Sequence, residues 1–174
     1  MKLLAALIAT LLISSNYAVE YTVYDQCDEK WKKDLLPGGQ SICQLGAILT
    51  CVSMVLTTLN RPCRASPCTP KALNTWLKQT GEAQGNLFPW GAVRALGLTY
   101  AGQSRDKAAI IEHVNKGDIV LLNTDRGAHW VLVKGYKEGQ GFEVIDPQPI
   151  GKGRRPIGLA AIFKNTPQSS SSPQ

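Results

Sequence analysis

Residues 41–60 read SICQLGAILTCVSMVLTTLN, and most of their side chains are apolar. Apolar residues recur at steps of three and four, which is the period of one helix face: Ile48, Val52, Val55 and Leu59. Most of the other side is apolar too, so we expect protein all round this helix. Its apolar run is shorter than the roughly 20 residues of a membrane span. The sequence therefore predicts a central buried helix over about residues 47–59, entered through Gly46.

The first 18 residues have the composition of a secretory signal peptide. They read MKLLAALIATLLISSNYA, with one lysine, an apolar run from Leu3 to Ile13, and small or polar residues up to Ala18. An apolar run of about 7–15 residues is typical of a signal core and too short to cross a membrane. We expect cleavage after Ala18, a secreted or secretory-lumen protein, and no membrane association of the mature chain. The alternative is an uncleaved anchor.

The rest of the chain predicts one domain, residues 19–166, and a disordered Ser-rich tail, residues 167–174. The formal net charge is +6, and the basic residues are scattered apart from small groups at 30–33 and 152–155. We interpret these groups as solvated surface, with an acidic or anionic polymer partner as the alternative. No nucleic-acid partner and no cofactor is predicted, and the oligomeric state stays open.

The five cysteines lie in the predicted mature chain, where secretion permits disulfides. An odd number leaves one thiol free unless it pairs between chains. Cys63 and Cys68 flank a proline-containing loop that they could close, Cys27 with Cys43 is the next plausible pair, and Cys51 in the buried helix is the candidate free thiol. Zinc is the rival explanation, but no C-x-x-C pair or neighbouring histidine has ligand spacing, so no metal is predicted.

Outside the central helix, the order of elements indicates the fold class. We expect helices over residues 70–80 and 106–115 and a short helical run at 92–96 within a loop-rich segment, residues 82–104. Strands are expected at 119–123, 130–136, 142–146 and 159–164, with a strand or extended arm at 21–26. Helices followed by strands predict an α+β domain, with N-terminal helices packed on a small antiparallel sheet.

Two residues in this strand region could share a catalytic site. His129 opens one predicted strand and Asp146 closes the next, so antiparallel pairing would bring them side by side. The carboxylate could then hold the imidazole in one tautomer while the other ring nitrogen faces a nucleophile. The structural alternative is a strand-end histidine bonded to backbone and an aspartate that bounds a turn. His113, the other histidine, is interpreted as a surface residue in a helix.

Five motifs, in order over residues 21–148, resemble the bacteriocin-processing type of papain-like cysteine peptidase. They are YDQCDEKW, G-x-x-L-T-x-x-x-M from Gly46 to Met54, TPKALNTWL, GAHWVLVKGY and VIDPQ. The chain is most similar to that family's secreted, transporter-free relatives. The resemblance implies a papain-like fold, a Cys, His, Asp triad, and cleavage of peptide or isopeptide bonds. It assigns His129 as the general base and Asp146 as its orienter.

The chain departs from this pattern at the nucleophile. Family members carry the catalytic cysteine directly after the glycine, seven residues before the methionine, and here that position is Ala47. The oxyanion-hole glutamine of many relatives falls on Ser41, so Gln40 is only an out-of-register candidate. A methyl group cannot attack a carbonyl carbon. We therefore expect a degenerate peptidase that binds a peptide or protein in its cleft, lined by Gly46 and Trp130.

Two alternatives stay open. The chain could be an active cysteine peptidase or amidase whose nucleophile is Cys43, or one whose native cysteine has been replaced by Ala47. Cys51 is a weaker candidate, because a thiol one turn inside a buried helix is expected to be inert. The other alternative is a disulfide-stabilised structural or interaction domain with a vestigial cleft.

Overall fold

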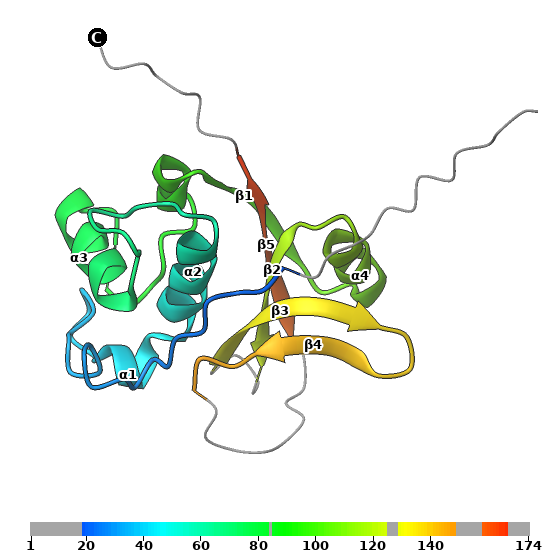
Figure 1. Ribbon diagram of the computed structural model, residues 1–174, viewed down its shortest axis with the longest axis horizontal. Helices are drawn as coiled ribbons and strands as arrows, with labels where there is room; N and C mark the ends of the chain where they lie inside the picture. Colours follow the sequence, from blue (N-terminus) through cyan, green and yellow to red (C-terminus); the bar gives the residue numbers. More distant parts are fainter. Residues whose placement is uncertain (1–18, 84, 125–128, 149–157, 167–174) are drawn as a thin grey trace, which may run out of the picture.

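Figure 1 shows the computed structural model, in which residues 19–83, 85–124, 129–148 and 158–166 are described. The predicted signal peptide and the predicted tail lie outside these residues. The helices are α1 (Ile42–Leu45), α2 (Ala47–Thr58), α3 (Pro70–Thr80) and α4 (Lys107–Asn115), with a 3-10 helix η1 (Ala92–Leu96). The strands are β1 (Leu98–Ser104), β2 (Ile119–Thr124), β3 (His129–Lys137), β4 (Gly141–Ile145) and β5 (Leu159–Asn165).

The strands form one antiparallel sheet in the order β1-β5-β2-β3-β4. The protein is therefore α+β, as predicted. One strand was missing from the prediction: β1 lies in the segment expected to be loop-rich. Its register against β5 shifts between Tyr100 and Gly102, and Gly102 has a φ of 116°, so the bulge breaks the alternation that would identify a strand.

The core has two layers, one on each face of the sheet. On one face α2 and α3 pack against Leu121, Leu132 and Phe163, and on the other Ile110 of α4 packs with alternate residues of the same strands. The N-terminal helices pack on the sheet as expected, and α4, which lies between β1 and β2 in the sequence, covers the opposite face. With both faces covered, every residue of β2 is buried, which explains its continuous apolar run.

Both predicted disulfides are present, Cys27–Cys43 and Cys63–Cys68, and Cys51 is a free, buried cysteine. Residues 21–26 form no strand but run as an irregular arm. In this arm the N–H of Thr22 donates a hydrogen bond to Thr58 Oγ1 at 2.9 Å. None of the helices among the described residues is long and apolar enough to cross a membrane.

Candidate functional site

His129 and Asp146 meet at one end of the sheet. His129 is the first residue of β3, Asp146 follows the last residue of β4, and these strands are antiparallel neighbours. The Nε2 atom of His129 lies 2.6 Å from Oδ1 of Asp146, and the two side chains are 7% and 24% exposed. The contact predicted from the sequence is confirmed.

Backbone and side-chain hydrogen bonds fix this pair. The carbonyl oxygen of His129 accepts from Asn123 Nδ2 at 3.3 Å, and Oδ1 of Asp146 accepts from the Gln148 N–H at 2.9 Å. Because a carboxylate only accepts, the proton between the two groups belongs on Nε2 of the imidazole. In the neutral form of this tautomer, the other ring nitrogen, Nδ1, carries a lone pair that can take a proton from a nearby donor.

The N-terminus of α2 supplies the second part of the site. α2 begins at Ala47, which is buried, and its N-cap residue Gly46 makes no side-chain capping bond. A Cβ on Gly46 would lie 2.4 Å from the Ile42 carbonyl oxygen, so only glycine fits the tight junction between α1 and α2. The partial positive charge at this helix end favours an anion or a thiolate, but Ala47 offers only a methyl group.

Helix α2 packs on β3 (Figure 1). The Sγ atom of Cys51 lies 3.8 Å from the carbonyl oxygen of Trp130, the residue after His129. Cys51 follows Ala47 by four residues, about 6 Å along the axis at 1.5 Å per residue. The contact between α2 and the start of β3 therefore lies one turn after Ala47. A helix-borne nucleophile and a strand-borne base require two such neighbouring elements.

Neither alternative cysteine offers a reactive thiol. Cys43 is bonded to Cys27, so the prediction of Cys43 as a nucleophile is wrong for the disulfide-bonded protein. Burial raises the pKa of Cys51 well above its ordinary value, and the negative charge of Asp146 raises it further. Cys51 is fully buried, and a protonated, buried thiol is inert.

Two predicted cleft residues have other partners in the structure. Gln40 is exposed, and its Oε1 accepts a hydrogen bond from Asn86 Nδ2. Trp130 is half-buried with its ring centroid 5.4 Å from that of Trp90, which in turn stacks on Tyr100 at 5.7 Å. Trp130 is therefore part of an aromatic cluster that joins β3 to the segment before η1. The roles proposed for Gln40 in an oxyanion hole and for Trp130 as a cleft wall stay predictions.

Gln26 is a residue of the site that sequence reasoning missed. It is 1% exposed, its Nε2 donates to the Cys43 carbonyl at 2.7 Å, and its backbone N–H donates to the Pro147 carbonyl at 2.7 Å. Its Oε1 has no hydrogen-bond partner among the described residues. The signal was available, because pairing Cys27 with Cys43 necessarily brings the neighbouring Gln26 to the entrance of the central helix.

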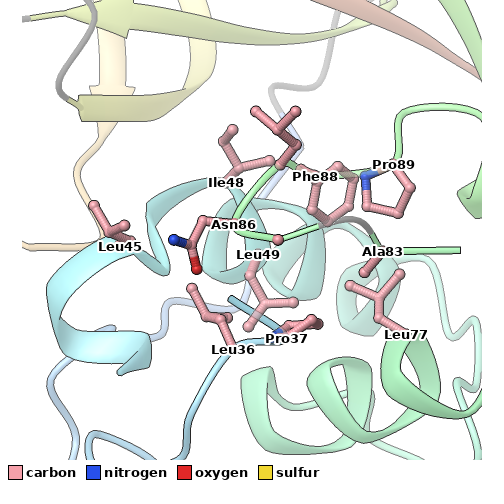
Figure 2. A pocket seen from close by; sticks show the side chains of 12 residues that line it. Leu36, Pro37, Leu45, Ile48, Leu49, Leu77, Ala83, Asn86, Phe88 and Pro89 are labelled. Atoms are coloured by element: carbon pink, nitrogen blue, oxygen red, sulfur yellow. The ribbon is translucent and has the colours of Figure 1, made fainter. Parts of the chain in front are cut away.

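An apolar pocket opens beside the first turn of α2. Figure 2 shows Leu45 and Ile48 from the two sides of the Gly46–Ala47 junction, with Phe88 and Pro89 of a neighbouring segment. The pocket has a volume of about 30 Å³, which exceeds the roughly 10–15 Å³ that one water needs. Two leucines that line the pocket are unusually exposed for apolar residues: 48% of the surface of Leu45 and 78% of that of Leu87 are accessible to solvent.

The second histidine differs from its prediction as a surface residue. His113 is half-buried near the end of α4, and its Nδ1 lies 2.7 Å from Oδ2 of Asp118. A histidine in the last turn of a helix also interacts favourably with the helix dipole when protonated. We interpret this pair as structural.

The His129–Asp146 contact has the geometry of a proton-transfer pair, but position 47 provides no nucleophile. Across the described ranges, no three His, Cys, Asp or Glu side chains gather as metal ligands would. No protein-family model, curated protein or solved structure matches the chain.

Proposed function

We propose that this protein is a secreted, papain-like pseudopeptidase that binds a peptide or an extended protein segment without cutting it. The observation that carries the proposal is Ala47 at the start of α2, beside a fully formed His129–Asp146 pair. The motif order supports the papain-like fold, and two disulfides are compatible with an extracellular location. The histidine that would act as the base is oriented by Asp146, but the cysteine that it would activate is replaced by Ala47.

The pocket beside Ala47 supports a peptide as the ligand. Its lining is mostly aliphatic, and two of the lining residues, Leu45 and Leu87, are exposed at the surface. A volume of about 30 Å³ accepts the end of one aliphatic side chain but not a packed helix. We therefore propose that an apolar side chain enters this pocket while the peptide backbone crosses the Gly46–Ala47 junction.

A phage-displayed library of random dodecapeptides, selected on the immobilised protein, tests this function. We expect enrichment of sequences with an apolar residue at one fixed position. Leu45→Arg should weaken binding of the selected peptides by tenfold or more, because one buried apolar side chain contributes about 1.5–3 kcal/mol. Val23→Arg is the matched control, since Val23 is also apolar and is 63% exposed on the N-terminal arm.

The same peptides, incubated with the protein and examined by mass spectrometry, distinguish binding from cleavage. We expect intact peptides. Cleavage that disappears in His129→Ala would instead establish an active enzyme and contradict the proposal. If selected peptides bind equally well to Leu45→Arg and to His129→Ala, the interaction surface lies elsewhere and the cleft is vestigial.

A further inference from the structure

A backbone hydrogen bond links Gln26 to the turn that carries Asp146. The Gln26 N–H donates to the carbonyl oxygen of Pro147 at 2.7 Å. Pro147 lies between Asp146, which accepts from His129 Nε2 at 2.6 Å, and Gln148, whose N–H donates to the same Asp146 oxygen at 2.9 Å. The orientation of the carboxylate therefore depends on where the N-terminal arm holds this turn.

A disulfide holds the arm at the same place. Cys27, the residue after Gln26, is bonded to Cys43, and Gln26 Nε2 donates to the Cys43 carbonyl at 2.7 Å. From the other side, Gln148 Nε2 lies 3.5 Å from Cys27 Sγ. The arm, the entrance to α1 and the Asp146 turn thus converge on one disulfide and one buried amide.

The rest of the arm is held by separate contacts: Thr22 N–H donates to Thr58 Oγ1 at 2.9 Å, and the Tyr24 hydroxyl donates to Thr57 Oγ1 at 3.2 Å. Residues 19–26 belong to no strand or helix, so no ladder of backbone bonds holds them. The second disulfide has a different setting: Cys63 and Cys68 are buried in the loop after α2. That loop is at the opposite end of the helix from Ala47, about 18 Å away for 12 residues at 1.5 Å each.

We propose that Gln26 and the Cys27–Cys43 disulfide are positioning groups of the His129–Asp146 pair, so that the pair is held only in the oxidised protein. This concerns the geometry of the pair and is independent of whether the cleft binds a peptide. A dithiol would release the pair by reducing the disulfide: the S–S bond accepts two electrons and two protons to give two thiols, and the dithiol is oxidised to a cyclic disulfide.

The imidazole N–H proton of His129 reports on the pair directly. A proton held between Nε2 and a carboxylate oxygen at 2.6 Å is expected to resonate downfield and to exchange slowly with water. We would record imidazole NMR spectra of the ¹⁵N-histidine-labelled full chain, and assign the signal by its absence in His129→Gln. His113 provides a second histidine signal in the same spectrum.

The decisive comparison uses the two disulfides as a matched pair. We expect the His129 N–H signal to be lost in the double variant Cys27→Ser/Cys43→Ser and retained in Cys63→Ser/Cys68→Ser. Loss in both variants, or retention in both, would overturn the proposal. Backbone amide spectra establish that each variant is folded.

A second variant decides the matter if Cys27→Ser/Cys43→Ser does not fold. Gln26→Leu keeps the disulfide and the side-chain volume but removes the bond to the Cys43 carbonyl. We expect the His129 N–H proton to exchange about tenfold faster or more, because the turn opens locally more often. Gln26→Glu retains an acceptor but loses the donor and should behave like Gln26→Leu. An unchanged exchange rate in both variants would overturn the proposal.

Discussion

The chain contains two histidine–aspartate pairs of similar length and different setting. His129 meets Asp146 at 2.6 Å through Nε2, and His113 meets Asp118 at 2.7 Å through Nδ1. The first pair joins the start of β3 to the residue after β4. The second joins the last turn of α4 to the residue before β2. The distance alone therefore does not identify a catalytic pair.

Burial and surroundings separate the two pairs. The His129 side chain is 7% exposed and that of His113 is 32% exposed. Helix α2, which packs on β3, begins at Ala47, one turn before the Cys51 thiol that contacts the carbonyl oxygen of Trp130. His113 and Asp118 are five residues apart in sequence, so this pair is local, whereas His129 and Asp146 are 17 residues apart. The contrast yields three predictions.

The largest effect is expected when a thiol is restored. In Ala47→Cys, a papain-type epoxide inhibitor should label the new thiol rapidly near neutral pH, because the helix N-terminus and His129 favour thiolate. Adding His129→Ala should slow labelling by about 100-fold or more, the usual contribution of a general base. Mass spectrometry of the labelled protein measures both rates.

The matched control for this experiment is His113→Ala in the same Ala47→Cys background, which should label at an unchanged rate. Equal slowing by the two histidine substitutions would mean that neither acts as a base on this thiol. No labelling of Ala47→Cys at all would show that the papain-like frame is not assembled at the start of α2.

The second prediction concerns stability at pH 7. Asp146→Ala leaves the buried His129 Nε2–H without its acceptor and should lower the free energy of unfolding by about 1–3 kcal/mol. Asp118→Ala should cost less than about 1 kcal/mol, because water can reach the partly exposed His113. Urea unfolding of the two variants measures the difference, and equal losses would contradict the distinction between the pairs.

The third and smallest effect is on the thiol next to the first pair. Burial, and then the charge of Asp146, raise the pKa of Cys51 well above its ordinary value of 9.0. The unfolded chain therefore releases this proton at a lower pH than the folded chain does. The resulting stability is fully present below about pH 9 and falls by up to about 1.4 kcal/mol per pH unit above it.

Cys51→Val removes this contribution while it keeps the side-chain volume similar. Urea unfolding at pH 8, 9 and 10 should show a steeper loss for the wild-type chain than for Cys51→Val. Parallel curves would mean that the Cys51 thiol titrates alike in the folded and unfolded chains.

The elements that the sequence predicted well are those with strong local signals. The helix over 70–80 has a threonine cap, a proline at its first position and Gly81 in the left-handed conformation at its end, and the structure has it as Pro70–Thr80. The four predicted strands are present within two residues at each end. The contact between His129 and Asp146 followed from the same reasoning, because it needed only the antiparallel pairing of consecutive strands.

The missed features depend on contacts between distant residues. β1 gains its strand geometry from pairing with β5, which lies about 60 residues later, and its bulge at Gly102 hides the alternation. The period of apolar residues predicts that α4 has an apolar side. It does not specify which face of the sheet that side covers. Gln26 reaches the site through the neighbouring Cys27–Cys43 disulfide and through its hydrogen bond to Pro147. Pro147 is more than 100 residues away in the sequence.

The place of β5 in the sheet also constrains how the chain reaches this structure. β5 comes after the other strands of the described residues, yet it lies between β1 and β2 and hydrogen-bonds to both. Until residues 159–165 arrive, β1 has no partner in the sheet and one edge of β2 is open. Pairings between residues so far apart make folding slow. The nascent chain therefore completes its sheet only after residues 159–165 have been synthesised, and a product shortened before residue 159 would expose two unpaired strand edges.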